Sequence, residues 1–156
     1  MKKIALIIIA LMVLNVYSDD YSLYVDADKL IQALIKKENP YGLPWLVGDK
    51  HLKNKAYGLL QIRLPYLNDV NRIAGKDVQK VWGKDKLEIS DMNNKEKAIW
   101  AAKVYLSHYG KVYYRKTGEK PSYEVYARIH NGGPNGWNKD TTLNYGKSVV
   151  KIIEGK

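Results

Sequence analysis

Apolar residues recur at helical spacing along most of this chain, and this pattern constrains the fold more than any other feature. The strongest example runs from Asn94 to Tyr109, where alanine, leucine and tyrosine side chains share one broad face before Gly110. The same spacing, with proline, threonine or glycine at the boundaries, predicts four further helices over residues 27–38, 65–75, 121–130 and 142–152. The 156-residue chain is therefore expected to form one mainly helical domain.

Two segments lack a clear helical period. The run from Ala56 to Ile62 is short and apolar with Gly58 in its middle, which fits either a strand or a buried turn. The segment from Lys76 to Met92 is polar and irregular, with a few side chains that pack locally. The expected fold class is therefore mainly α, of an α+β kind with at most a small β-sheet.

The N-terminus predicts export. Three residues, Met1–Lys3, form a short basic start, residues 4–16 are apolar apart from one asparagine, and Val16–Ser18 resembles a cleavage site. Residues 1–18 are therefore predicted to be a signal peptide, with the domain spanning 19–156 in the periplasm or outside the cell. The alternative is an uncleaved anchor, although the apolar run is shorter than the roughly 20 residues that span a membrane.

The chain contains no cysteine, which excludes disulfides, thiolate nucleophiles and thiolate metal sites. Its three histidines are not at metal-ligand spacing, so neither a metal nor another cofactor is expected. The net charge of +10 favours binding to polyanions. After export these are cell-wall polymers and lipid headgroups, so peripheral attraction to the envelope is expected and nucleic acid is not. The alternative is that the lysines simply keep the protein soluble.

Glu38 occupies a position that an ordinary structural role does not explain. It continues the apolar stripe that includes Leu30 and Leu34 and ends the predicted helix over residues 27–38. A carboxylate on the core face of a helix is costly unless it is paired or protonated, and such a setting suits a general acid. The alternative is a buried structural ion pair, for which Arg128 is the candidate partner.

Three further segments present polar groups suited to binding a ligand. The segment Gly58–Gln61 places an amide side chain after a glycine, where a ligand can approach the backbone. The segment Ala127–Gly133 presents Asn131 between a helix end and two glycines. The last predicted helix carries Tyr145 one turn after its start.

Taken in this order, the four segments resemble the lysozyme-like superfamily, above all the soluble lytic transglycosylase domain and the goose-type lysozymes. The resemblance runs from about Leu30 to Val150. It implies a lysozyme-like α+β fold with any sheet beside the active-site cleft, a monomer, and a glycan strand of peptidoglycan as substrate. The bond cleaved would be the β-1,4 bond between N-acetylmuramic acid and N-acetylglucosamine.

The resemblance also implies roles for individual residues. Glu38 would be the catalytic acid, with Asn39 in place of the serine that usually follows. Gln61 falls in the family's Gly-Leu-Met-Gln motif and would contact sugar, although tying backbone loops is its alternative role. Asn131 matches the Asn of the family's Tyr-Asn-Ala-Gly motif and carries the same alternative, with His130 in place of the Tyr.

Four aromatic residues complete the expected binding groups. Tyr145 matches a late tyrosine that lies near the catalytic acid in the family. Tyr57, His130 and Trp137 are further candidate sugar contacts, and Trp137 is the candidate for stacking on a sugar ring.

Asp49 is the candidate second carboxylate. The pair Gly48–Asp49 is similar to a Gly-Asp pair of goose-type lysozymes, in which the aspartate helps to position a water molecule. A second aspartate of those lysozymes has its equivalent here at Arg63, so the hydrolytic arrangement is half present. The alternative role for Asp49 is to cap its own loop.

We therefore predict a secreted muramidase, preferably a lytic transglycosylase. In such enzymes one glutamate gives a proton to the leaving oxygen and then takes one from the sugar's 6-hydroxyl, which forms a 1,6-anhydro product. The first alternative is a hydrolytic lysozyme that uses Asp49 to position water. The others are a non-catalytic wall-binding module and a cationic membrane-active protein.

Overall fold

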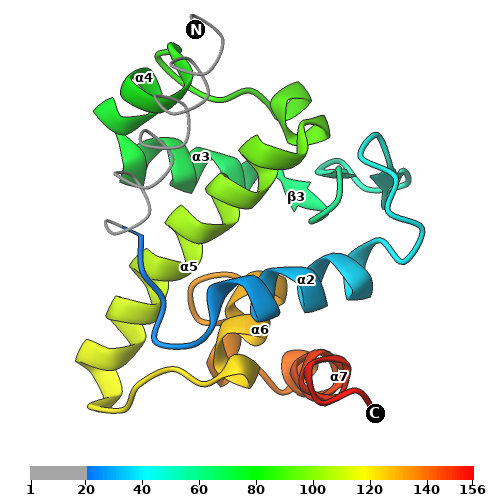
Figure 1. Ribbon diagram of the computed structural model, residues 1–156, viewed down its shortest axis with the longest axis vertical. Helices are drawn as coiled ribbons and strands as arrows, with labels where there is room; N and C mark the ends of the chain where they lie inside the picture. The colour runs from blue at the N-terminus through cyan, green and yellow to red at the C-terminus, as the bar shows by residue number, and fades with distance from the viewer. Residues whose placement is uncertain (1–20) are drawn as a thin grey trace, which may run out of the picture.

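The computed structural model describes residues 21–156 and confirms the expected fold class, mainly helical with a small antiparallel sheet (Figure 1). The predicted signal peptide lies outside the described residues. The α-helices are α2 (Ala27–Glu38), α3 (Leu64–Ala74), α4 (Lys76–Trp82), α5 (Lys95–Thr117), α6 (Tyr123–Gly132) and α7 (Leu143–Glu154). The strands are β1 (Val47–Gly48), β2 (Ala56–Tyr57) and β3 (Ile62–Arg63), and the 3₁₀ helices are η1 (Ile89–Asn93), η2 (Gly136–Asn138) and η3 (Asp140–Thr142).

Helix α5 runs through the middle of the molecule, with α3 and α4 at one end and α2, α6 and α7 towards the other (Figure 1). One face of α5 is almost completely buried, with small alanines in its first half and tyrosines in its second half. The core that they share is one contiguous cluster that includes Leu34 of α2, Val70 of α3, Leu106 of α5 and Ile129 of α6.

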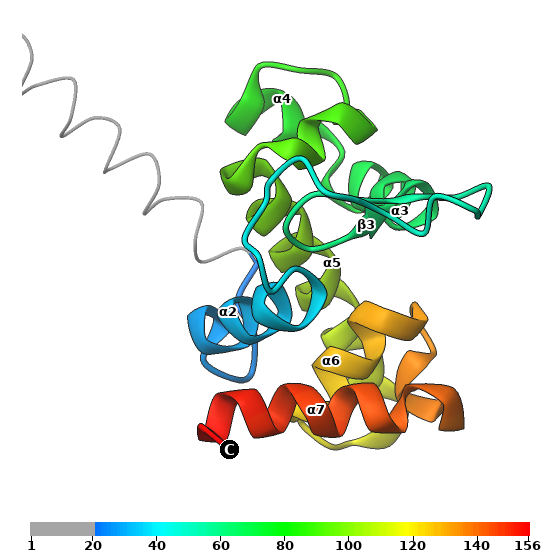
Figure 2. The same ribbon diagram turned by 90° about the vertical axis from the view of Figure 1, so that its right-hand side faces the viewer.

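Helices α2 and α7 lie side by side on one edge of the molecule (Figure 2). The Asp26 side chain caps α2 by accepting a hydrogen bond from the Lys29 N–H at 3.0 Å. At the other end, buried Asn39 donates to the Leu43 carbonyl at 2.6 Å and accepts from the Leu43 N–H at 3.2 Å. These two bonds hold the backbone immediately after Glu38, the last residue of α2.

The apolar run from Ala56 to Ile62 contains strands β2 and β3 and the turn between them. The sheet has the order β1-β2-β3, with Val47 opposite Tyr57 and Ala56 opposite Arg63. Gly58 has a φ of 76°, and a Cβ atom there would lie 2.0 Å from the Met92 carbonyl oxygen. Only glycine therefore fits this turn against η1.

Two expectations about the helices are wrong. Helix α5 does not end at Gly110 but continues to Thr117. A Cβ atom on Gly110 would lie 2.5 Å from the Tyr126 hydroxyl, so this glycine allows α6 to pack closely against the middle of α5. The segment after Gly75 is also not wholly irregular, because Lys76–Trp82 forms α4 around the fully buried Val78.

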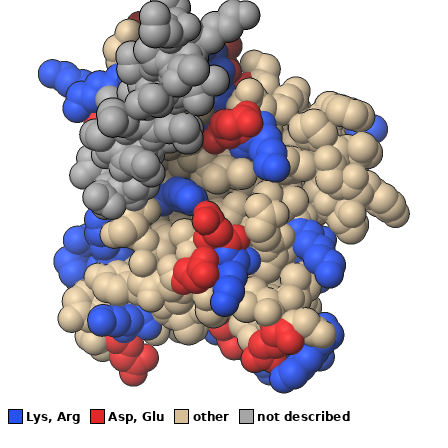
Figure 3. Space-filling view, in the orientation of Figure 1, with Lys and Arg blue, Asp and Glu red and all other residues tan. Residues whose placement is uncertain are grey.

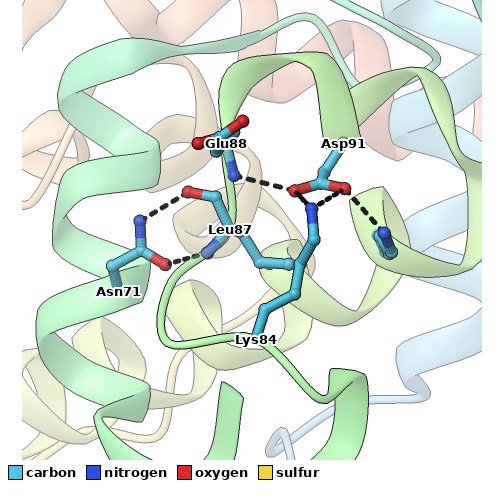
Figure 4. A network of polar contacts seen from close by, with 6 residues as sticks. Asn71, Lys84, Leu87, Glu88 and Asp91 are labelled. Atoms are coloured by element: carbon cyan, nitrogen blue, oxygen red, sulfur yellow. Dashed lines mark hydrogen bonds and ion pairs between the residues drawn. The ribbon is translucent and has the colours of Figure 1, made fainter. Parts of the chain in front are cut away.

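A buried carboxylate fixes the segment between α4 and α5 (Figure 4). The two oxygens of Asp91 accept hydrogen bonds from Lys84 Nζ at 2.9 and 2.8 Å, from Lys97 Nζ at 2.6 Å and from the Glu88 N–H at 2.8 Å. Asn71 of α3 adds two bonds to the backbone of Leu87. These bonds anchor η1, which in turn packs against Gly58 of the sheet.

None of the helices formed by residues 21–156 has the length and apolar character needed to cross a membrane.

Candidate functional site

A cavity of about 450 Å³ opens between the helical core and the sheet. Its walls come from the end of α2, all three strands, α3, α5 and the end of α6 with the loop that follows. Predicted site residues that line it are Glu38, Asp49, Gln61, His130 and Asn131. The fold thus brings together residues that are up to 93 positions apart in the sequence.

Glu38 projects from the last turn of α2, and 19% of its side chain remains exposed. The Tyr145 hydroxyl, which comes from α7, donates a hydrogen bond to Glu38 Oε1 at 2.5 Å. Burial, followed by the neighbouring Glu38 carboxylate, raises the pKa of Tyr145 far above its usual value, so the hydroxyl stays a donor. No residue between 21 and 156 donates to Glu38 Oε2, which leaves this oxygen for a ligand.

His130 lies next to Glu38, with its Nε2 atom 3.9 Å from Glu38 Oε1. The same Nε2 lies 3.2 Å from the Leu60 carbonyl oxygen, and because a carbonyl only accepts, Nε2 carries the proton. The Nδ1 atom then accepts from the Tyr66 hydroxyl at 3.3 Å. Burial lowers the pKa of His130 despite the opposing effect of Glu38, so the ring is neutral near pH 7.

The Gln61 side chain holds the sheet together at the cavity wall. Its Nε2 atom donates to the Gly58 carbonyl at 2.8 Å and to the Leu46 carbonyl at 3.3 Å. A Cβ atom on Gly48 would lie 2.0 Å from Gln61 Oε1, so glycine is required for this amide to sit against β1. The loop-tying role considered for Gln61 is therefore present, and its amide also faces the cavity.

Asp49 follows β1 in a left-handed conformation, with a φ of 48°. Its carboxylate forms an ion pair with Arg63 of β3, in which about 40% of each side chain is exposed. Arg63 also donates to the Asn54 carbonyl at 2.5 Å. Arg63 therefore fixes the Asp49 carboxylate at the sheet side of the cavity.

Trp137 and Tyr57 do not line the cavity. Trp137 lies in η2 and packs edge-on against Tyr113, with ring centroids 5.2 Å apart. Its ring is partly buried against the hydrophobic core. Tyr57 packs against the core from β2. The stacking predicted for Trp137 and the sugar contact predicted for Tyr57 are therefore not supported by their positions.

Three residues of the cavity were missed by the sequence analysis as site residues. Tyr66 and Asp69 line it from α3 and Tyr105 lines it from α5. The spacing of Tyr66 and Asp69, three positions apart in a predicted helix, was the available signal that both face the same way. Tyr105 gave no such signal, because it lies within the apolar stripe of its helix.

Within residues 21–156, no three His, Asp or Glu side chains are grouped so that they could hold a metal ion. The chemical groups at the cavity are thus carboxylates, hydroxyls, amides, one neutral imidazole and the guanidinium of Arg63. Such a set can exchange protons and form hydrogen bonds with a polyhydroxylated ligand.

No known family model matches the chain, and neither does any curated protein. Among solved structures, the Tapes japonica lysozyme is 28% identical with a TM-score of 0.60, over 80% of this chain and 88% of that one. A chain in the crystal structure of Aeromonas hydrophila PliI in complex with Meretrix lusoria lysozyme is 22% identical with a TM-score of 0.63. That match covers 84% of this chain and 93% of the other.

These matches agree with the expected lysozyme-like fold. Neither is to a soluble lytic transglycosylase or to a goose-type lysozyme, so that narrower resemblance remains a prediction.

Proposed function

We propose that this protein is a glycosidase that cleaves the β-1,4-linked glycan strand of peptidoglycan, with Glu38 as the general acid. The observation that carries the proposal is the setting of Glu38 in the cavity. Tyr145 holds one carboxyl oxygen, and the other is left for the leaving oxygen of a glycosidic bond. The lysozyme-like fold supports a role in peptidoglycan cleavage.

Hydrolysis is the reaction that the geometry favours. Most glycosidases use two carboxyl groups, one that protonates the leaving oxygen and one that acts on water or on the sugar. Asp49 supplies a second carboxylate at the wall of the same cavity, and its pairing with Arg63 fixes the direction of that carboxylate. The similarity to the Tapes japonica lysozyme supports the same reaction.

The transglycosylase reaction predicted from the sequence remains the second candidate, and one observation favours it. Arg63 compensates the charge of Asp49, which weakens this aspartate as a stabiliser of a positively charged transition state. Glu38 would then act alone, first as an acid and then as a base towards the sugar's 6-hydroxyl.

Mass spectrometry of the fragments released from purified peptidoglycan tests both steps. Reducing muramyl ends are expected for hydrolysis, whereas 1,6-anhydro ends would establish the transglycosylase. Glu38→Gln should release no fragments, and the matched control Glu96→Gln, at an exposed site on α5, should be fully active. Cleavage that survives in Glu38→Gln would refute the proposal, and a folded but inactive parent protein would favour the wall-binding module.

A variant of Asp49 distinguishes hydrolysis from the transglycosylase reaction in a second way. For hydrolysis, Asp49→Asn should lower the rate by about a hundredfold or more, in line with the usual contribution of a positioned acid or base. For the transglycosylase, the same variant should retain most of its activity. Asp85→Asn makes the same charge change at an exposed position outside this cavity and serves as the control.

Attraction to an anionic envelope is a further part of the proposal. Lys and Arg are spread over the face seen in Figure 3, with Asp and Glu between them, and do not form one dense patch. Binding to the wall should therefore be diffuse and should weaken as ionic strength rises. Sedimentation of Glu38→Gln with purified walls at increasing salt tests this, and binding that is independent of salt would contradict it.

A further inference from the structure

Most of the large hydrophobic side chains that are exposed to solvent belong to the part of the chain that forms the sheet. Residues 21–156 contain six such side chains, and four of them lie between the end of α2 and the first residue of α3. These four are Tyr41, Trp45, Leu52 and Leu64. None of them lines the cavity that holds Glu38, so the cleavage step proposed above does not account for their exposure.

The loop between β1 and β2, residues 49–55, is exposed along its whole length and projects away from the helices (Figure 2). Leu52 lies in this loop between Lys50 and Lys53, is 42% exposed and does not belong to the hydrophobic core. Its N–H donates to the Asp49 carbonyl at 2.8 Å, so these residues form a turn. The turn thus presents a leucine to solvent at a position where packing does not require one.

Arg63 holds this loop at both ends. It forms the ion pair with Asp49 at the start of the loop, and it donates to the Asn54 carbonyl at 2.5 Å near the end. Because the ends are fixed in advance, the loop loses less conformational freedom when it binds a partner.

The loop is also positively charged. Lys50, Lys53 and Lys55 are exposed, and none of the ion pairs formed within residues 21–156 includes them. The one carboxylate of the loop, that of Asp49, is already paired with Arg63. Three uncompensated positive charges therefore surround an exposed leucine, which favours an anionic partner with an apolar phase.

An anionic lipid bilayer combines these two properties. Lysines near its surface are attracted by the headgroups, aromatic side chains favour the headgroup level, and a leucine gains free energy when it leaves water. A wall polymer in water offers charge without an apolar phase. A protein partner fits less well, because the buried core of a protein–protein interface is depleted in lysine.

We propose that the loop over residues 49–55 docks the protein reversibly on an anionic lipid bilayer. Leu52 enters the interface, the three lysines contact headgroup phosphates, and Tyr41 and Trp45 add aromatic surface of the kind that favours the headgroup level. This docking differs from diffuse attraction to the wall, because it assigns binding to one loop and requires an apolar phase. Asp49, at the base of the loop, also lines the cavity, so docking holds the cavity close to the membrane.

Sedimentation with sucrose-loaded vesicles tests the proposal on the protein recovered after export. The probes are vesicles of phosphatidylcholine alone and vesicles of an equal mixture of phosphatidylcholine and anionic phosphatidylglycerol. The parent should bind the mixed vesicles, bind the neutral ones weakly and lose affinity as ionic strength rises. Combined replacement of Lys50, Lys53 and Lys55 by glutamine should weaken binding about a hundredfold, since each lysine near an anionic membrane contributes about fivefold. Leu52→Ser leaves the charge unchanged and should weaken binding about fivefold.

Matched variants separate the loop from the general charge and hydrophobicity of the surface. Combined replacement of Lys111, Lys120 and Lys151 by glutamine makes the same charge change at exposed positions outside the loop and should alter binding far less. Tyr114 of α5 is 41% exposed, close to the 42% of Leu52, and Tyr114→Ser should bind as the parent does. The replaced loop residues are exposed, so the loop variants should unfold at the same urea concentration as the parent.

Three results would overturn the proposal: no binding of the mixed vesicles by the parent, equal losses in the loop-lysine and control-lysine variants, or undiminished binding by Leu52→Ser. The second would show that the attraction is spread over the whole surface, and the third that charge alone binds, as expected for a wall polymer. None of them bears on cleavage, because the vesicles contain no glycan.

Discussion

Replacement of Asp91 by asparagine should remove a stabilising interaction whose size depends on pH. Burial by itself would raise the pKa of the Asp91 carboxyl, but the Glu88 N–H and the ammonium groups of Lys84 and Lys97 outweigh it. The result is a pKa of about 2 in the folded protein, against a reference value of 3.8. This difference corresponds to about 2 kcal/mol of folding free energy at neutral pH.

The sign of the pH dependence follows from the lowered pKa. The stabilisation is complete above about pH 5, where Asp91 is ionised in both the folded and the unfolded chain. It falls to about 1 kcal/mol near pH 3 and is largely lost near pH 2, as the folded carboxyl takes up its proton. The asparagine variant cannot titrate at this position, so its difference from the parent should shrink over that range.

Urea unfolding at pH 7, 4 and 3 measures this difference, with equal m-values as the check that both proteins unfold in the same way. Because parent and variant are compared at each pH, the titration of all other groups cancels to a first approximation. Asp85→Asn changes the same charge at an exposed position six residues away and should differ little from the parent at any pH. A constant difference between Asp91→Asn and the parent from pH 7 to pH 3 would refute the reasoning.

Three other perturbations have definite expected outcomes. Tyr145→Phe removes the donor to Glu38 and should lower the rate of peptidoglycan cleavage about tenfold or more in a turbidity assay; an unchanged rate would show that the bond has no part in catalysis. Gly110→Ala should destabilise the fold by about 1–3 kcal/mol in urea, since its Cβ would clash with Tyr126, whereas helix propensity alone would make it stabilising. His130 has a lowered pKa when folded, so the free energy of unfolding should fall as pH drops below about 6.5, and a smaller fall in His130→Gln is the test.

Much of the fold could be predicted from the sequence because the helices are amphipathic and bounded by proline, asparagine or glycine. Helix α2 ends at Glu38, the residue at which the apolar stripe ended before Asn39–Pro40. The end of α5 could not be predicted, because a glycine that ends a helix and a glycine that admits a neighbouring tyrosine look the same in sequence. The position of Tyr126 in the structure shows that Gly110 is a glycine of the second kind, which makes room for a neighbouring side chain.

The candidate site was predictable where a residue type was out of place. Glu38 on an apolar stripe and Asn131 before two glycines are such cases, and both line the cavity. Tyr105 was not predictable, because a tyrosine on an apolar face is normal and its place at the cavity is a property of its surroundings. Proximity of Trp137 to a glycine-rich loop does not tell whether its ring points to the loop or to the core, so its packing against Tyr113 could not be predicted, and its sugar contact stays a prediction.

The hydrogen bond between Tyr145 and Glu38 has a consequence for the time at which the proposed activity can arise. Its two residues are 107 positions apart, and Tyr145 belongs to the last helix of the chain. Contacts of such long range form late, after the chain between them has been ordered. During synthesis Glu38 is made long before its partner, so a growing chain carries the acid without the group that orients it. We therefore expect the proposed activity to reach its full level only after the final helix has been made and has packed against α2.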